Sequence, residues 1–530
     1  MPVNSSSLLS IIAHARSGAL ARAKAMFAEA GFERIDDDAA VLSVKGRLLK
    51  DEALAARGRE RKRLYRESAR AYARAGEIGG ASYPLINAAT LSLLAGERRE
   101  SEQLARRILA RGDEEAETPY WRAATRAEAR LLLGETEAAK ASLKEAVACA
   151  PLAHEDHAST LRQFGLILDE LRGSKVWLDA FRPPRSLHFA GHMSLATTRS
   201  ALDREIRKRI AEERIGFGYG ALAAGADIVI AEALLETGAE LHLVLPAAVN
   251  VFRAGSVARC GASWAKRFDI VAERACSIRT IGSSEESLSP LAIRLAAEVA
   301  MGSAIMQAET LMTEAVQLLI LDRKAEPQSM RSASGAIARA WRYGGRRQHI
   351  LTAPRLREPA LAPLRRRLDR SERLVAVLRI DPSHTPADQV FKHILPRTAK
   401  IVTSNGERPI APYWTGEAVI AAFDTPAVAA DAALEISVAL GNSARLRICG
   451  DYGVVRIVPN PFGGTPFLAG APAATPGQIA PSTPDGAIHI TEDFAAALCA
   501  GAAGGRPRVE FIGELPARME TPIRLFSLRR

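Results

Sequence analysis

Leu187-His-Phe-Ala-Gly-His192 is a short apolar run that ends in a glycine and a histidine. It opens a region in which such runs alternate with helical patterns, an order that is typical of βαβ units and a parallel sheet. The strands expected here are Leu187–Ala190, Arg214–Phe217, Leu241–Leu245, Ser277–Ile281 and Val316–Leu321. Residues 186–322 are therefore predicted to form a Rossmann-like parallel sheet.

The second of these strands leads into Gly216-Phe-Gly218-Tyr-Gly220, then Gly225-Ala-Asp227 and a helix that carries Glu232. A glycine-rich loop before a helix N-terminus attracts phosphate, because backbone N–H groups and the helix dipole favour anions. The candidate nucleotide-binding residues are Gly191, His192, Gly216, Gly218, Gly220, Gly225, Asp227 and Glu232. Asp227 lies nearest the helix start and is the candidate for a ribose hydroxyl, with Glu232 in a supporting role. The alternative is that these glycines serve only tight packing.

The same region resembles a known family. Phe189-Ala-Gly-His192, the Gly-x-Gly-x-Gly segment, Gly225-Ala-Asp227 and Ala239–Pro246 together resemble the SLOG superfamily. That Rossmann-like group includes cytokinin-activating phosphoribohydrolases and sensors of nucleotide-derived ligands, so the resemblance implies a nucleotide or nucleotide-derived ligand. The Pro-Gly-Gly-x-Gly-Thr-x-x-Glu loop of the phosphoribohydrolases is not present, which favours sensing over hydrolysis.

A second resemblance lies within residues 371–530 and is carried by Val375–Asp381, Trp414–Phe423, Leu446–Gly453 and Thr483–Glu492. These stretches together resemble a class III nucleotidyl cyclase domain. The resemblance implies a ferredoxin-like cyclase fold in which Asp381 and Glu417 are the carboxylates that would bind Mg²⁺. It also implies a homodimer, or a heterodimer with a complete cyclase, because the family's active site lies between two such domains.

This region departs from the family at three catalytic positions. Ala474 and Gln478 stand where the family has an Asn and an Arg, and Tyr413 stands where a Lys reads the purine. Neither Ala474 nor Gln478 can neutralise a developing phosphoryl charge, an interaction worth several kcal/mol of barrier. We therefore expect a cyclase-like pseudoenzyme. In the alternative interpretation Asp381 only caps a helix and Glu417 is an ordinary hairpin residue.

Residues 1–180 are helical in pattern and carry a repeated spacing of small and large apolar residues. It reads Gly18-x4-Ala23-x3-Phe27-x2-Ala30 and again Gly134-x4-Ala139-x3-Leu143-x2-Ala146. This spacing resembles the second helix of a tetratricopeptide repeat, and Tyr83–Gly96 resembles the TRAFs-binding region of bacterial signalling proteins. The sequence predicts a helical solenoid that binds a protein partner or serves as a spacer.

Composition favours a cytoplasmic protein of several domains. No apolar run in the 530 residues reaches the ~18 residues of a membrane span, and the five scattered cysteines form no CxxC pair. The net charge of +11 is concentrated in residues 321–370, where 13 Lys or Arg face four Asp or Glu. Residues 323–370 are expected to be a basic, solvated linker. Only Trp341 and Tyr343 interleave with its arginines, too few for a nucleic-acid stacking surface.

The predicted fold is multidomain α plus α/β: a helical solenoid, a Rossmann-like sheet and a cyclase fold. The favoured function is an intracellular signalling protein that binds a partner and senses a nucleotide. One alternative is an active adenylate or guanylate cyclase that works with a partner subunit. A second alternative is a nucleotide N-glycosidase acting through the central domain.

Overall fold

The computed structural model describes residues 5–111, 117–193, 195, 200–281, 288–322, 333–355, 371–382, 385–404, 409–441, 446–461, 463–501, 507–516 and 522–530. The chain forms two compact units. The first is Met1–Pro183 with the short segment Thr310–Met312. The second is Pro184–Glu309 with Thr313–Arg530.

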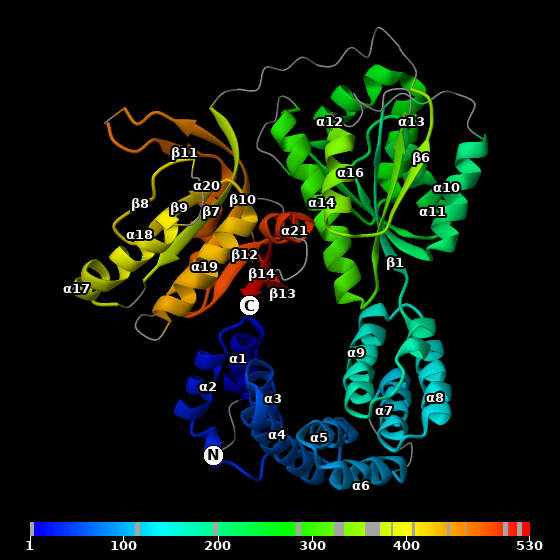
Figure 1. The fold of residues 1–530 in the computed structure, drawn as a ribbon, viewed down its shortest axis with the longest axis vertical. Helices are drawn as coiled ribbons and strands as arrows, with labels where there is room; N and C mark the ends of the chain where they lie inside the picture. Colours follow the sequence, from blue (N-terminus) through cyan, green and yellow to red (C-terminus); the bar gives the residue numbers. More distant parts are fainter. Residues whose placement is uncertain are drawn as a thin grey trace. The chain divides into compact units, whose positions relative to one another are not determined.

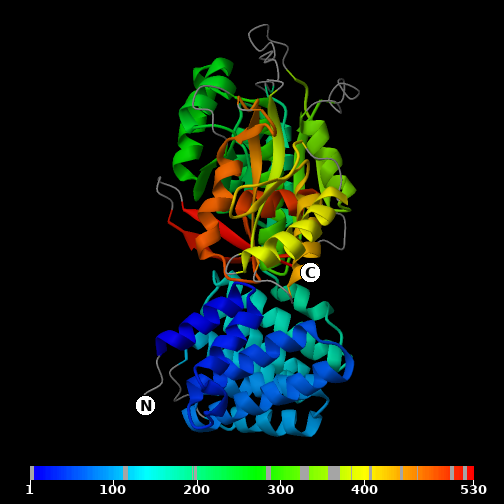
Figure 2. The same ribbon diagram turned by 90° about the vertical axis from the view of Figure 1, so that its left-hand side faces the viewer.

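The first unit is built of helices that pack in consecutive pairs (blue to cyan in Figures 1 and 2). They are α1 (Ser5–Arg16), α2 (Leu20–Glu29), η1 (Phe32–Arg34), α3 (Ala39–Ala55), α4 (Gly58–Gly79), α5 (Ser82–Ala95), α6 (Arg98–Leu109), α7 (Pro119–Leu132), α8 (Thr136–Cys149), α9 (His154–Glu170) and η2 (Val176–Phe181). Gly96 and Gly134 end α5 and α7 with φ of 89° and 79°, a left-handed conformation that glycine adopts without strain. The helical prediction for this region is confirmed.

Small residues bring neighbouring helices of this unit close together. A Cβ on Gly46 of α3 would lie 2.7 Å from the ring of Tyr72 in α4. A Cβ on Gly76 of α4 would lie 2.6 Å from Leu85 of α5. The repeated spacing seen in the sequence works in the same way, since Ala23 and Phe27 are both buried in the α1–α3 core. Close approach of this kind is what a helical repeat requires.

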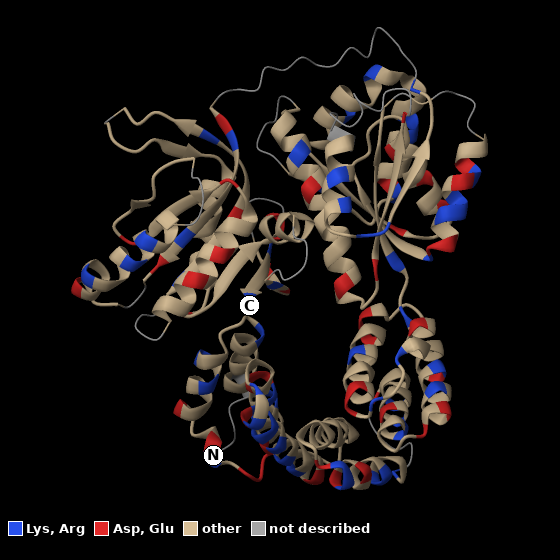
Figure 3. Ribbon diagram, viewed as in Figure 1, with Lys and Arg blue, Asp and Glu red and all other residues tan. Residues whose placement is uncertain are grey.

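The helix α4 is the most basic described helix of the first unit (Figure 3). Its side chains include seven Lys or Arg and three Asp or Glu. Several of the arginines are paired: Arg63 with Glu60 and Glu67, and Arg66 with Glu97. Exposed pairs of this kind contribute little to stability and keep the helix solvated.

The second unit contains a six-stranded parallel sheet in the order β4-β3-β2-β1-β5-β6. Its strands are β1 (Arg185–Gly191), β2 (Ile215–Gly220), β3 (Glu240–Leu245), β4 (Ser277–Thr280), β5 (Ala315–Leu321) and β6 (Gln348–Thr352). The helices between them are α10 (Ser200–Glu212), α11 (Ala226–Glu236), α12 (Val249–Ser256), η3 (Ala258–Cys260), α13 (Ala262–Arg274), α14 (Pro290–Thr310) and α16 (Ala333–Tyr343). All strand pairs are parallel, as the sequence predicts.

The strand β6 corrects the expectation of a solvated linker over residues 323–370. Of that range, 323–332 and 356–370 lie outside the described residues, and the rest forms α16 and β6. A buried polar chain holds β6: Gln348 Nε2 donates to Gln317 Oε1 at 2.6 Å, and Gln317 Nε2 donates to His188 Nδ1 at 3.0 Å. Burial lowers the pKa of His188 to about 3, so this ring is a neutral acceptor. Trp341 of α16 stacks on it and is fully buried.

A second sheet follows, in the order β13-β14-β12-β10-β7-β9-β8, with β11 paired to β10. Its strands are β7 (Glu372–Asp381), β8 (Tyr413–Trp414), β9 (Val419–Phe423), β10 (Arg447–Val458), β11 (Phe467–Ala469), β12 (Ile488–Thr491), β13 (Arg508–Leu515) and β14 (Ile523–Arg529). Its helices are α17 (Ala387–Gln389), the π-helical η6 (Val390–Ile394), α18 (Leu395–Ser404), α19 (Pro426–Leu440), α20 (Ala471–Ile479), η7 (Ala480–Ser482) and α21 (Glu492–Gly501). One apolar core joins β7 to α18, α19 and α21. Alternation along β7 sends Val375 and Val377 to a smaller core on the opposite face.

The helix α14 belongs to both halves of the second unit. Leu295, Ala296, Val299 and Ala300 share the core of the second sheet. The contact with α21 is so close that a Cβ on Gly302 would lie 1.8 Å from the carbonyl oxygen of Ala496. Among the described helices, α14 alone is long and apolar enough to cross a membrane, but more than half of its apolar stretch is buried inside the protein. Its packing is that of a core helix.

Candidate functional site

The carboxyl edge of the parallel sheet has the geometry of a ligand site. The strand order reverses between β1 and β5, because β2, β3 and β4 follow on one side of β1 while β5 and β6 lie on the other. In open parallel sheets, ligands bind outside the carboxyl ends of the strands at such a reversal. Here β1 ends at Gly191 beside the start of α11. A Cβ on Gly191 would lie 2.3 Å from Ala226, so only glycine permits this approach.

Asp227 ties the start of α11 to the end of β1. Its carboxylate accepts hydrogen bonds from the backbone N–H groups of Ala223, at 3.1 Å, and of Gly191. The residue is only 7% exposed, and burial raises the pKa of its carboxyl to about 7. Asp227 therefore holds the Gly225 turn, where φ is 101°, against the strand. Its contact with a ribose hydroxyl stays a prediction.

His192 is also held by the backbone of this edge. Its N–H donates to the carbonyl oxygen of Ile320 and its own carbonyl accepts from Ala226, both at 3.2 Å. The ring nitrogens lie 3.0 Å from the carbonyl oxygens of Met193 and Ala353. The imidazole thus bridges the segments that follow β1 and β6. Gly191, His192, Gly225 and Asp227 are brought together as the sequence suggests.

The expectation of a loop at Gly216, Gly218 and Gly220 is wrong, because all three lie within β2. A Cβ on Gly218 would lie 2.5 Å from Leu234 of α11, and one on Gly220 would lie 2.7 Å from Phe189. A Cβ on Gly216 would similarly meet Pro184 at 2.5 Å. These glycines allow helix and strand to pack closely, which was the alternative interpretation.

Glu232 lies farther along α11, and an arginine occupies its carboxylate. Arg267 of α13 donates from Nε to Oε1 of Glu232 at 2.6 Å. The guanidinium also lies over the ring of Trp264, 4.4 Å from its centroid. This ion pair holds α13 against α11. The carboxylate of Glu232 therefore serves helix packing.

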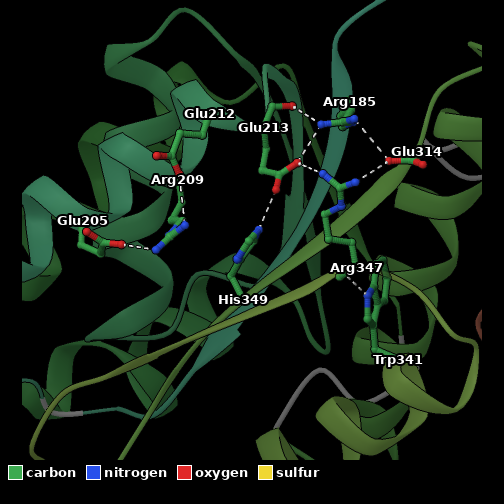
Figure 4. Close-up of polar contacts among 9 residues, drawn as sticks. All are labelled: Arg185, Glu205, Arg209, Glu212, Glu213, Glu314, Trp341, Arg347 and His349. Carbon is green, nitrogen blue, oxygen red and sulfur yellow. Dashed lines mark hydrogen bonds and ion pairs between the residues drawn. The ribbon is translucent and has the colours of Figure 1, made fainter. Parts of the chain in front are cut away.

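A charged network fastens the opposite, amino edge of the sheet, and sequence reasoning missed it (Figure 4). Glu213 Oε2 accepts from Arg185 at 2.7 Å and from Arg347 at 2.9 Å, and its Oε1 lies 2.8 Å from His349 Nε2. Burial opposes ionisation of Glu213, but these partners outweigh it and lower the pKa. Since ligands bind at the carboxyl edge, this network serves to hold β6 on the sheet.

In the second sheet, Asp381 and Glu417 both lie close to the guanidinium of Arg379. Alternation along β7 places Arg379 on the same face as Asp381. Nη2 of Arg379 lies 3.6 Å from Asp381 Oδ2 and 3.3 Å from Glu417 Oε2. Mg²⁺ needs near-octahedral oxygen ligands at about 2.1 Å, and a guanidinium beside both carboxylates would repel it. As they stand, these residues do not fit a magnesium site.

The other three cyclase-like positions carry no cation. Ala474 and Gln478 lie on exposed positions of α20, one turn apart, and the nine residues of α20 include no charged side chain. Tyr413 lies half-buried in β8, and burial raises the pKa of its hydroxyl. Among the described residues, no three His, Cys, Asp or Glu side chains are grouped to hold a metal ion.

A buried charged cluster joins the two sheets. Arg279 of β4 contacts Glu492 at 2.8 Å and Asp493 at 2.5 Å, both at the start of α21. Burial raises the pKa of Asp493 to about 7. Asp451 of β10 is buried beside them and accepts from the hydroxyl of Thr491 at 2.6 Å. No motif in Ser277-Ile-Arg-Thr280 points to this role, because its partners lie more than 170 residues later in the chain.

Comparison with known proteins gives a match for the first helices. A family model described as Tetratricopeptide Repeats-Sensor matches residues 6–92. The N-terminal region is thus a helical region with a tetratricopeptide-type match. Among curated proteins, none matches this chain.

Solved structures of cyclase catalytic domains are similar to part of the chain. The catalytic core of a rhodopsin-guanylyl cyclase with converted specificity, in complex with ATPalphaS, is 15% identical, with a TM-score of 0.26, over 30% of this chain and 96% of that one. The guanylate cyclase domain of RhGC from Catenaria anguillulae, in complex with GTP, is 16% identical, with a TM-score of 0.26, over 30% and 99%. The adenylyl cyclase CyaB from P. aeruginosa is 12% identical, with a TM-score of 0.25, over 30% and 95%. These values carry no conclusion about what this chain binds or does.

Proposed function

We propose that this protein is a signalling protein with three parts. Its helical repeats bind a protein partner, its parallel sheet binds a nucleotide or nucleotide-derived ligand, and its cyclase-like domain relays the signal without cyclase turnover. The observation that carries the proposal is Arg379, which lies against both carboxylates expected to bind metal. A divalent ion would have to displace this guanidinium, and α20 offers no cation for the triphosphate.

Ligand binding is assigned to the carboxyl edge around Gly191 and His192. Gly191 brings the end of β1 against the first turn of α11, since a Cβ there would lie 2.3 Å from Ala226, and an anion is favoured at a helix N-terminus. The adjoining segments 196–199, 323–332 and 356–370 lie outside the described residues. A ligand held here would contact β1, β5 and α11.

Relay to the cyclase-like domain is supported by the shared core of the second unit. The contact between Gly302 and Ala496 is too close to allow sliding of α14 past α21 without separation. Arg279 adds a buried ionic contact between β4 and the start of α21. A change at the parallel sheet that moves α14 or β4 would therefore move the cyclase-like domain.

The test is a titration of the full-length protein with ATP, GTP and NAD by calorimetry, with chromatography of the products. We expect micromolar to millimolar binding of one compound, and no cyclic nucleotide with Mg²⁺ or Mn²⁺. His192→Ala should weaken binding at least tenfold, whereas Glu232→Gln, which changes only the pair with Arg267, should not.

Three results would contradict the proposal. Cyclic nucleotide formation that disappears in Asp381→Ala would make the protein an active cyclase. Release of a free base that disappears in Asp227→Ala would make it an N-glycosidase. No heat with any compound would leave the parallel sheet as a scaffold.

We also propose that the cyclase-like domain pairs with a second copy of itself or with another cyclase-like chain. Exposed apolar side chains of this domain include Phe467 and Phe511, at 46% and 47% exposure. Sedimentation of the full-length protein at micromolar concentration should give a dimer. A monomer at every concentration, with no partner captured, would argue against pairing through this domain.

A further inference from the structure

Four polar side chains of the helical repeats converge from alternate helices. They are Lys50 of α3, Thr90 of α5, Glu128 of α7 and Gln163 of α9, named here the Glu128 cluster. The hydroxyl of Thr90 donates to Oε1 of Glu128 at 2.5 Å, and Nε2 of Gln163 donates to the same oxygen at 3.3 Å. The helices α5, α7 and α9 pack directly on one another, which brings these side chains to one place.

The two charged members of the cluster have unused hydrogen-bonding atoms. Within the described residues, nothing donates to Oε2 of Glu128 and nothing accepts from Nζ of Lys50. The charges of Lys50 and Glu128 act on each other, yet they form no ion pair within 4.0 Å. The carboxylate therefore keeps an unused acceptor and the ammonium an unused donor, and the two groups lie more than 4.0 Å apart.

Packing alone does not account for this arrangement. Burial raises the pKa of Glu128 to about 7 and lowers the pKa of Lys50, so folding opposes both charges. Apolar residues of similar size would fill these positions at lower cost. The neighbours are already apolar, with Ala89, Leu93 and Leu131 in the surrounding core. Lys50, Glu128 and Gln163 nonetheless remain half-buried and so are reachable from solvent.

Two exposed aromatic side chains lie on the same helix faces. Tyr83 is seven residues before Thr90 on α5, and Trp121 is seven residues before Glu128 on α7. Seven residues make about two turns, so each pair shares a face. Tyr83 is 57% exposed and Trp121 is 37% exposed, unlike most large apolar residues of this unit. Seven residues also span about 10 Å along a helix, so these rings flank the cluster and take no part in the contacts proposed below.

We propose that the Glu128 cluster is a binding site for a neutral ligand that presents an N–H group beside a C=O group. The ligand N–H donates to Oε2 of Glu128, and the ligand C=O accepts from Nζ of Lys50. Carboxamides and lactams carry this pattern on one planar edge. The source of the group is either a free small molecule or the carboxamide of an asparagine in a peptide. This site is separate from the nucleotide site proposed for the parallel sheet.

The direct test is ligand-observed NMR with the full-length protein and matched probes. Uracil and nicotinamide carry the N–H and C=O edge, whereas 1,3-dimethyluracil and nicotinic acid lack the N–H. N-acetyl-asparagine amide represents a peptide source. We expect the edge-bearing probes to bind at millimolar concentration and the matched probes to bind at least tenfold more weakly. Preference for N-acetyl-asparagine amide over uracil would assign the site to a peptide, and the reverse to a small molecule.

Variants separate a binding role from a structural one. Glu128→Gln and Lys50→Met should each abolish probe binding, while Glu145→Gln, an exposed carboxylate on α8 paired with Arg126, should not. Glu128→Gln keeps an oxygen for Thr90 and Gln163, so it should raise the melting temperature at pH 8 by removing an unpaired charge. Binding to wild type should strengthen about tenfold from pH 6 to pH 8 as Glu128 ionises.

Two kinds of result would overturn the proposal. One is a failure of the probe pattern, in which 1,3-dimethyluracil binds as tightly as uracil or no probe with the N–H and C=O edge binds. The other is a lower melting temperature for Glu128→Gln at pH 8 together with unchanged probe binding, which would make Glu128 a structural partner of Lys50.

Discussion

Asp227 is a buried carboxylate that should give the stability of the second unit a pH dependence. Its folded pKa is about 7 against an ordinary value of 3.8, so the folded state binds the proton more tightly. The contribution of this proton to the free energy of unfolding is fully present below pH 3.8 and is lost as pH rises through 7. Asp227→Asn removes this ionisation and should be more stable than wild type at pH 8, by roughly 4 kcal/mol. Urea denaturation of wild type and variant at pH 5 and pH 8 measures the difference in their free energies of unfolding. The same difference at both pH values would contradict the prediction.

Arg379 decides whether the two cyclase-like carboxylates are open to a metal ion. Its guanidinium lies within 4 Å of both Asp381 and Glu417. Arg379→Ala removes the competing charge, so Mn²⁺ should bind at least tenfold more tightly, a gain of about 1.4 kcal/mol. Electron paramagnetic resonance counts the free Mn²⁺. Arg456→Ala, an exposed arginine of β10, is the control and should leave Mn²⁺ binding unchanged.

At the scale of elements, strands could be predicted where a short run of residues between two helical segments itself indicates a strand. β1, β3, β4 and β5 fall within two residues of their expected bounds. β1, β3 and β5 are largely apolar runs between helices, whereas β4 is Ser277-Ile-Arg-Thr280 and mostly exposed. The glycines of β2 misled the prediction because Leu234, in the helix that follows β2, fills the space that a side chain at Gly218 would need. β6 is short and polar, and its place depends on Gln317, which no local pattern reveals.

The strand β6 depends on Glu213, which should make a single isosteric change costly. Glu213→Gln keeps the size of the side chain but removes the charge shared by Arg185, Arg347 and His349. We expect a loss of about 1–3 kcal/mol, discounted because these partners are partly exposed. Hydrogen exchange should rise in β6 more than in β3. Glu212→Gln is the matched control on the neighbouring exposed residue, and an equal effect of both changes would rule out the fastening role.

At the scale of the molecule, the sequence could indicate which residues share a position only where a resemblance or a local pattern joined them. The resemblance led to Asp381 and Glu417, and the alternation of β7 could have shown that Arg379 shares the face of Asp381. The Glu128 cluster and the Arg279 contacts could not be predicted in this way. In each, the contacting residues lie on elements far apart in the chain, and no sequence motif links them. Their positions follow from helix packing that only the folded chain fixes.

The last prediction concerns the joint between the two sheets. Because a Cβ on Gly302 would meet the backbone of Ala496, Gly302→Val should force α14 and α21 apart. Overpacking of this kind costs about 1–3 kcal/mol or more. Hydrogen exchange of the full-length variant should rise in α21 and β10, while helices of the first unit such as α5 keep their protection. Gly501→Ala, at the end of α21 where a Cβ meets nothing within 4 Å, is the control. Binding of the nucleotide proposed for the parallel sheet is measured alongside, and unchanged binding with raised exchange in α21 would confine the effect of the substitution to the joint. Unchanged exchange in α21 would mean that the two sheets do not depend on this contact.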